Sequence, residues 1–169
     1  VAKAMSIFPK LLGRRGRFVY VYEKRYNRID AAIAKVLDNI EYYKGIYLNV
    51  NEKKILEPTG LETSRNLGDL RMKRGRTTGL TIGKVFALDV NVPVSGYACN
   101  TTAWFEYQVA IVSDAGKFSD AGDSGSCIIN PETNKITELL FAGGRTPEGL
   151  DITIANPIEY VVDELGFSL

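Results

Sequence analysis

The chain of 169 residues contains no histidine. A serine hydroxyl is a weak nucleophile at neutral pH, so a neighbouring base, most often histidine, has to accept its proton. Histidine is also a common zinc ligand, and pairs of cysteines at zinc-binding spacing are missing as well. The sequence on its own therefore excludes histidine-dependent catalysis and zinc sites of these kinds.

Cysteine is nearly absent, with only Cys99 and Cys127 in the whole chain. Two cysteines permit one disulfide, but they are too few for the disulfide framework of a small secreted domain. Cys127 also opens the apolar stretch Cys127–Ile129, which favours a reduced, buried side chain. The count therefore favours an intracellular compartment.

Long apolar runs and an excess of charge are missing too. No stretch of about 18 apolar residues occurs, so no transmembrane helix is expected. The formal net charge is +1, which gives no overall field to favour nucleic acid or a membrane as a partner. The N-terminus has no signal-peptide pattern and begins with Val1 rather than Met, which we interpret as a processed product or a fragment of a longer protein.

What remains is the composition of a globular protein, with 45% hydrophobic and 24% charged residues. The patterns of β-branched and aromatic residues predict mostly β-strands, at residues 17–22, 86–94, 104–112, 128–129 and 136–142, with Gly143 and Gly144 ending the last of them. Within 104–109, alternation places Phe105, Tyr107 and Val109 on one face. Glycines at 75, 79 and 83 indicate bulges or close backbone approach in the bent strands of a small barrel.

Two further segments complete the expected secondary structure. Residues 157–166 predict a C-terminal helix, with Asn156 as its capping residue and Gly166 at its end. Residues 30–36 fit either a short helix with Asp30 as N-cap or a strand packed by Ile33 and Val36. Residues 56–69 are rich in Gly, Pro, Thr, Ser and Asn and predict a long loop.

Residues 122–126 read Gly-Asp-Ser-Gly-Ser directly before an apolar strand, which points to Ser124 as a nucleophile. The alternative is a surface turn that has this sequence by chance. The run resembles the nucleophile motif of chymotrypsin-like (trypsin-fold) serine proteases. The segment 76–81, Arg-Thr-Thr-Gly-Leu-Thr, is similar to a branch of trypsin-like peptidases from fungi, bacteria and plants. The resemblance covers about residues 17–169, and the terminal helix fits it.

The resemblance implies a mostly β chain that forms the second barrel of a double β-barrel, with a linker segment before it. Residues 1–55 are then the remnant of the inter-barrel segment, and residues 56–169 are the barrel with the nucleophile motif and the helix. In such a protein the backbone N–H groups of Gly122 and Ser124 form the oxyanion hole. Asp123 points inward and locks the turn, and Gly125 allows close packing behind the nucleophile.

The same family uses His, Asp and Ser in that chain order. Asp30 is the expected acid, because its context Ile29–Ala34 resembles the segment between the two barrels. The alternative is an ordinary helix N-cap on a solvated surface. The histidine is expected upstream of Asp30, yet only 29 residues precede it. We therefore expect it on a preceding segment, which is either a separate chain after autoproteolytic cleavage or lost. The triad mechanism needs no cofactor and no metal.

The resemblance also implies the substrate-binding residues. Phe118 matches the base of the main pocket, which argues against a pocket built for Lys or Arg, although it fits a core residue equally well. Ala142, Gly143 and Gly144 match the wall that pairs with substrate backbone. The predicted function is a serine endopeptidase that acts on peptides or proteins. The alternatives are an inactive pseudoprotease that binds peptides and a purely structural β domain.

Overall fold

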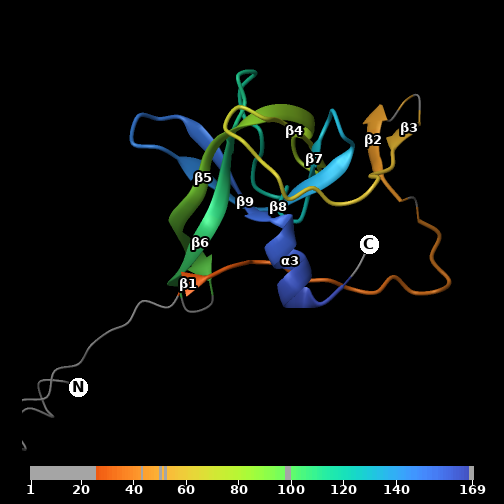
Figure 1. Ribbon diagram of the computed structural model, residues 1–169, viewed down its shortest axis with the longest axis horizontal. Helices are drawn as coiled ribbons and strands as arrows, with labels where there is room; N and C mark the ends of the chain where they lie inside the picture. The colour runs from red at the N-terminus through yellow and green to blue at the C-terminus, as the bar shows by residue number, and fades with distance from the viewer. Residues whose placement is uncertain (1–25, 43, 50, 52, 98–99, 168–169) are drawn as a thin grey trace, which may run out of the picture.

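The computed structural model describes residues 26–42, 44–49, 51, 53–97 and 100–167 (Figure 1). The expected strand at 17–22 and Cys99 lie outside the described residues. The described chain is mostly β, with one helix near its C-terminal end. Its elements are β1 (Tyr26–Asn27), β2 (Ile46–Asn49), β3 (Lys54–Leu56), β4 (Leu70–Gly75), β5 (Gly79–Tyr97), β6 (Thr101–Val112), β7 (Cys127–Asn130), β8 (Lys135–Arg145), β9 (Asp151–Pro157) and α3 (Ile158–Leu165).

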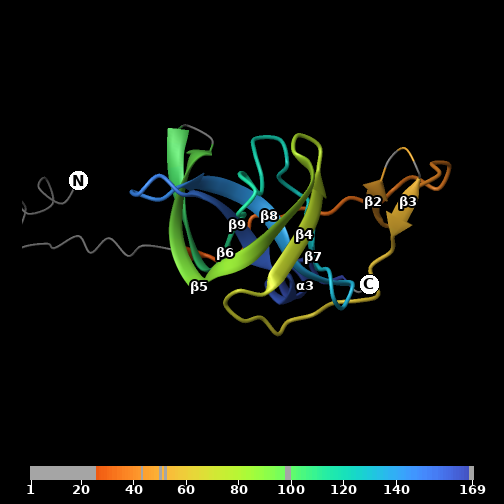
Figure 2. The same cartoon turned by 90° about the horizontal axis from the view of Figure 1, so that it is seen from above.

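Six of these strands form a closed barrel. The sheet order is β1-β6-β5-β4-β7-β8-β9, and an additional pairing of β6 with β9 closes β4 to β9 into a ring. β1 adds to the outside of this ring, parallel to β6, with Tyr26 opposite Trp104. β2 and β3 form a separate hairpin beside the barrel (Figures 1 and 2). The architecture confirms the predicted second barrel of a double β-barrel with a C-terminal helix.

Two apolar clusters hold the barrel and the helix together. The first fills the barrel with side chains from β5 to β9 and from the segment between β6 and β7, namely Val85, Val109, Ile111, Phe118, Ile128, Leu140 and Ala155. The second packs α3 against the sheet through Ile129, Ile136, Ile158 and Val161. Gly166 ends the helix in the left-handed conformation, as the sequence predicts. No helix in the described part of the chain is long and apolar enough to cross a membrane.

Cys127, at the start of β7, is a free thiol that contacts this second cluster. Burial raises its pKa, because the thiolate is poorly solvated there. This supports the apolar role predicted for Cys127.

Three local predictions were wrong. Residues 30–36 form neither a helix nor a strand. Gly143 and Gly144 do not end β8, because the strand continues to Arg145 through its pairing with β9. Tyr107 does not share the buried face of Phe105 and Val109, because the bulged pairing with β5 turns its backbone to a φ of 59° and leaves its side chain 45% exposed. Gln108 takes the buried position instead.

The strand glycines sit where backbone approaches closely. A Cβ atom at Gly83 would lie 2.5 Å from the carbonyl oxygen of Val112 and 2.7 Å from the ring of Phe118. Gly75, at the end of β4, lies against the carboxylate of Asp123, and a side chain there would displace it. Absence of a side chain at Gly75 therefore lets the nucleophile motif pack against the β4–β5 hairpin.

Candidate active site

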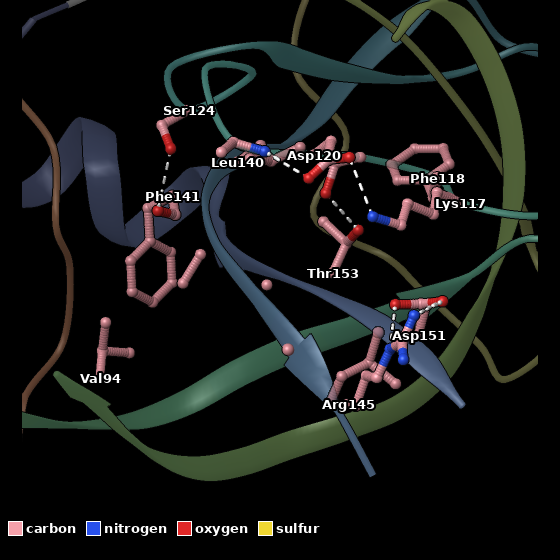
Figure 3. Close-up of a pocket in the computed structure, with 16 residues that line it drawn as sticks. Val94, Lys117, Phe118, Asp120, Ser124, Leu140, Phe141, Arg145, Asp151 and Thr153 are labelled. Atoms are coloured by element: carbon pink, nitrogen blue, oxygen red, sulfur yellow. Dashed lines mark hydrogen bonds and ion pairs between the residues drawn. The ribbon is translucent and has the colours of Figure 1, made fainter. Parts of the chain in front are cut away.

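Ser124 lies exposed on the turn that enters β7, beside β8 (Figure 3). Its hydroxyl donates a hydrogen bond of 3.2 Å to the carbonyl oxygen of Phe141. The turn is closed by backbone bonds from Asp123 N–H to Asp120 and from Ser126 N–H to Asp123, both 3.0 Å. Gly125 N–H reaches Leu140 on β8 at 2.7 Å. The serine oxygen is therefore held on a tight turn, at the surface and against a strand.

The two predicted oxyanion donors carry no partner in the described part of the chain. Neither Gly122 N–H nor Ser124 N–H has a backbone or side-chain acceptor among the residues 26–167 that are described. Gly122 has a φ of 96°, which favours glycine. A Cβ there would also collide with the guanidinium of Arg76. Both N–H groups are thus available to an external acceptor.

Asp123 points inward and is 1% exposed. Its carboxylate accepts hydrogen bonds from Thr77 N–H at 2.7 Å, from the Thr78 hydroxyl at 2.7 Å and from Asp120 N–H at 3.1 Å. The ammonium of Lys73 on β4 pairs with it at 3.2 Å and is fully buried. Burial alone would raise the pKa of Asp123, but these donors outweigh it and hold the pKa well below its usual range. The negative charge of the Asp123 carboxylate is therefore buried beneath the turn.

Lys73 was not anticipated from the sequence. Burial lowers its pKa, and the attraction of Asp123 opposes that shift. Lysine is rarely buried without a partner, and nothing in its local sequence marks Lys73 as a buried residue. The expectation that Asp123 points inward could have indicated a buried cation beside it, because a buried carboxylate needs a partner.

Asp30 lies on the barrel surface, in the segment after β1. Its backbone N–H donates to Asn156 Oδ1 and its carbonyl accepts from Asn156 Nδ2, both at 3.0 Å. Gln108 fixes the same segment by donating to the carbonyl of Arg28 at 2.8 Å. The Asp30 carboxylate accepts a hydrogen bond from the hydroxyl of Tyr97. Asp30 is therefore no helix N-cap, and four hydrogen bonds hold it and the adjoining backbone to the barrel.

The prediction that Asn156 caps the C-terminal helix was wrong. The helix begins after Pro157, and no side-chain hydrogen bond caps it. The Asn156 amide is fully buried and bonds to Asp30 and to the carbonyl of Leu139 instead. Sequence position before Pro157 is typical of a cap, so only the tertiary contact reveals the role of this amide.

A pocket of about 460 Å³ opens beside Ser124 (Figure 3). Ala142, Gly143 and Gly144 line it, as does Phe118. The ring of Phe118 also belongs to the barrel core, and its role at the base of a substrate pocket stays a prediction. The carbonyl oxygen of Phe118 accepts a hydrogen bond from the Thr81 hydroxyl at 2.8 Å, which ties this lining segment to β5.

Paired polar groups line the rest of this pocket. The hydroxyls of Ser119 and Thr153 lie 2.6 Å apart. Lys117 pairs with Asp120 at 2.9 Å and Arg145 pairs with Asp151 at 3.0 Å. Each lining cation therefore has its own carboxylate, and the pocket presents two neutral hydroxyls.

The strand beside Ser124 has one free edge. β7 pairs with β8 only up to Leu139, whereas β9 pairs with β8 as far as Arg145. Among the described residues, no strand pairs with the other edge of 141–145. That edge begins where the Ser124 hydroxyl meets Phe141, so an extended peptide added to it would pass the serine.

A metal site is not found in the described residues, which contain no group of three or more Cys, Asp or Glu side chains placed to hold an ion.

Comparison with known proteins gives no relative by sequence, since no protein family and no curated protein matches the chain. Solved structures do match. Chymotrypsin of Cellulomonas bogoriensis aligns with a TM-score of 0.55 at 16% identity, over 73% of this chain and 61% of its own. Protease A of Thermobifida fusca aligns with a TM-score of 0.56 at 18% identity, over 73% of this chain and 58% of its own.

A glutamic-acid-specific serine protease aligns with a TM-score of 0.57 at 16% identity, over 79% of this chain and 63% of its own. The chain thus spans about three fifths of the length of these structures. At such identities the likeness concerns the fold. The chain has the fold of the second β-barrel of chymotrypsin-like (trypsin-fold) serine proteases.

Proposed function

We propose that this chain is the nucleophile-bearing part of a chymotrypsin-like serine endopeptidase, and that a segment outside this sequence supplies the histidine. One observation carries the proposal. Ser124 lies exposed between a pocket, two unclaimed backbone N–H groups and the free edge of β8. This combination provides a nucleophile, a place for the substrate side chain, donors for an oxyanion and a partner for the substrate backbone.

The reaction follows from these positions. A peptide pairs with the free edge of β8, and its side chain enters the pocket. The Ser124 oxygen attacks the carbonyl carbon while the supplied imidazole takes the serine proton. The oxyanion accepts hydrogen bonds from Gly122 N–H and Ser124 N–H, which contribute roughly 3–4 kcal/mol each in such sites. Asp30 holds the imidazole and stabilises its charged form.

The intermediate then collapses. The C–N bond breaks, and the leaving amine takes the proton from the imidazolium. The carboxyl part of the substrate stays attached to Ser124 as an ester. Water attacks this ester, the imidazole accepts the proton of that water, and the serine is released with its proton restored.

Exposed apolar side chains support a protein partner that carries the histidine. Within 33–42, directly after Asp30, five large side chains form what we name the apolar strip: Ile33, Val36, Leu37, Ile40 and Tyr42, which are 45–69% exposed. Several large apolar side chains exposed within one segment are typical of an interaction surface. Its position next to Asp30 fits a partner that places its imidazole between Asp30 and Ser124.

The pocket favours substrates with an uncharged side chain at the cleaved position. The cations and carboxylates that line it neutralise each other, and Ser119 with Thr153 offers only neutral hydroxyls. A buried Phe118 at the base leaves no carboxylate there to bind Lys or Arg. One structural neighbour is described as specific for glutamic acid, but here no lining cation is left unpaired to bind a carboxylate.

The experiment is labelling of Ser124 by a fluorophosphonate in the complete protein, meaning this chain together with the polypeptide encoded directly before it. Labelling and peptide cleavage are expected in wild type and in Ser95→Ala, which removes an exposed serine outside the motif. Both are lost in Ser124→Ala. A folded complete protein that shows no labelling contradicts the proposal.

The alternative is a pseudoprotease that binds extended peptides without cleaving them. The absence of histidine favours it, and the free edge of β8 supplies the binding mode. This function predicts binding of peptides along residues 141–144 that is unchanged in Ser124→Ala. Cleavage that vanishes in that variant excludes it.

A further inference from the structure

Tyr97 makes an unexpected contact with the candidate acid. It is the last residue of β5, and its hydroxyl donates to Oδ2 of Asp30. None of the described residues makes a hydrogen bond to the other oxygen, Oδ1. Burial and the hydrogen bond to Asp30 both raise the pKa of Tyr97, so the phenol stays protonated and remains a donor.

The ring of Tyr97 joins Asp30 to the strand that contacts the nucleophile. It packs on Phe105 with the ring centres 6.1 Å apart, and Phe105 packs on Phe141 at 4.9 Å. Phe141 provides the carbonyl that accepts the Ser124 hydroxyl. Phe105 is 3% exposed, so this row of rings is anchored in the barrel. Tyr97 therefore has a fixed position relative to both candidate catalytic groups.

The two hydrogen bonds between Asn156 and the backbone of Asp30 do not determine the orientation of the Asp30 carboxylate. Asn156 fixes the N–H and carbonyl of Asp30, but it makes no contact with the carboxylate oxygens. The terminal torsion of an aspartate side chain is broad and roughly two-fold. A donor of fixed position is therefore needed to choose one orientation, and Tyr97 is the donor that the structure places there.

We propose that Tyr97 is a positioning residue, which turns the Asp30 carboxylate so that one oxygen is held and the other is free for an incoming imidazole N–H. This inference rests on the proposed function. Tyr97 acts through Asp30 and takes no part in bond making or breaking. It also lies outside the pocket lining, so it has no direct contact with the substrate side chain.

The first arm of the test uses this chain alone and needs no activity. The ionisation of Tyr97 is followed by ¹³Cζ NMR on tyrosine-labelled protein. In Asp30→Asn the negative charge is gone, so Tyr97 ionises at lower pH than in wild type. An unchanged titration shows that the contact with Asp30 is absent in solution, and it overturns the inference whatever the protein catalyses.

The second arm compares Tyr97→Phe with wild type in the complete protein. Loss of the hydroxyl frees the carboxylate to rotate, so kcat falls about tenfold to a hundredfold while KM is unchanged. The acid limb of the pH profile of kcat/KM moves to lower pH, because a misdirected carboxylate stabilises the imidazolium less. A purely structural role for Tyr97 predicts no movement of this limb.

Tyr107→Phe is the matched control, since it removes an exposed hydroxyl and keeps the ring that contacts Tyr160. It leaves kcat and the pH profile unchanged. An equal kcat in Tyr97→Phe and wild type overturns the inference. If wild type shows neither labelling nor turnover, the proposed function fails and the catalytic role of Tyr97 fails with it, while the NMR arm still reports the contact.

Discussion

The nucleophile turn and the apolar strip differ in how the rest of the chain holds them. The turn at 120–126 is tied by its own backbone bonds, by β8 and by the buried pair of Asp123 with Lys73. The strip at 33–42 lies in a segment without regular secondary structure, and its large side chains face solvent. The turn carries Ser124 and the strip follows Asp30 in the chain, yet only the turn is held by contacts with the barrel.

On the proposed function, this difference separates the parts of the site that the barrel builds from those that another polypeptide would supply. Asp30 lies at the boundary, because the clamp by Asn156 stops there and the strip begins three residues later. In the proposed complex, this chain positions Asp30 and Ser124 before the partner binds, and the partner supplies only the histidine. Four predictions test this division.

The largest effect is expected where the turn meets the barrel, in Asp123→Ala. The change leaves the ammonium of Lys73 buried without its carboxylate and removes the acceptor of two threonine groups. Loss of one partner of a buried pair costs about 3–5 kcal/mol in the free energy of unfolding. Urea denaturation of the isolated chain measures this loss. Asp114→Ala, which breaks an exposed pair with Lys84, is the control and changes stability by less than about 0.5 kcal/mol.

The same carboxylate gives a pH dependence. Because the pKa of Asp123 is depressed in the folded chain, its contribution to stability is fully present above about pH 4, the usual range of an unfolded aspartate. That contribution is lost as the pH falls below this value. When thermal unfolding is measured between pH 7 and pH 2, the melting temperature should therefore fall more steeply with decreasing pH in wild type than in Asp123→Asn. If the stability of the two proteins changes with pH in the same way, the buried carboxylate of Asp123 does not stabilise the turn as described.

A smaller and more local effect is expected for Asn156→Ala. This change removes the amide that satisfies both backbone groups of Asp30, which costs about 1–3 kcal/mol. Hydrogen exchange at the Asp30 amide becomes faster, while exchange at Gly125 and Ser126 in the turn stays as in wild type. Asn66→Ala, at an exposed loop amide, leaves both regions unchanged.

The sequence predicted the barrel well, because its strands follow local patterns. The pairing of β7 with β8, the helix with Gly166 at its end and the loop before β4 all depend on residues that are near neighbours in the chain. The predicted face of Tyr107 was wrong because a β-bulge interrupts the two-residue alternation of β6. The bulge depends on the pairing with β5. Local pattern carries no information about that partner.

The site was predictable where the motif is local and unpredictable where contacts are long-range. The turn that carries Ser124 could be inferred from five consecutive residues, whereas the catalytic role of Ser124 stays a prediction. The contacts of Asp30 join residues that are 67 and 126 positions apart in the chain, so nothing in its local sequence reveals Tyr97 or Asn156. The same reason explains Asn156, whose place before Pro157 is typical of a helix cap.

The smallest effect on this chain alone is expected in the apolar strip, for Leu37→Ser. Leu37 is 69% exposed and contributes little to the fold, so the isolated chain should lose less than about 0.5 kcal/mol. Leu67→Ser, at a loop leucine that is 65% exposed, is the matched control. In the complete protein the two variants should diverge, because only Leu37 lies where the partner is proposed to bind. Sedimentation or size exclusion should show weaker association with the preceding polypeptide for Leu37→Ser and unchanged association for Leu67→Ser. Equal association of both variants would place the partner elsewhere and leave the apolar strip without its proposed occupant.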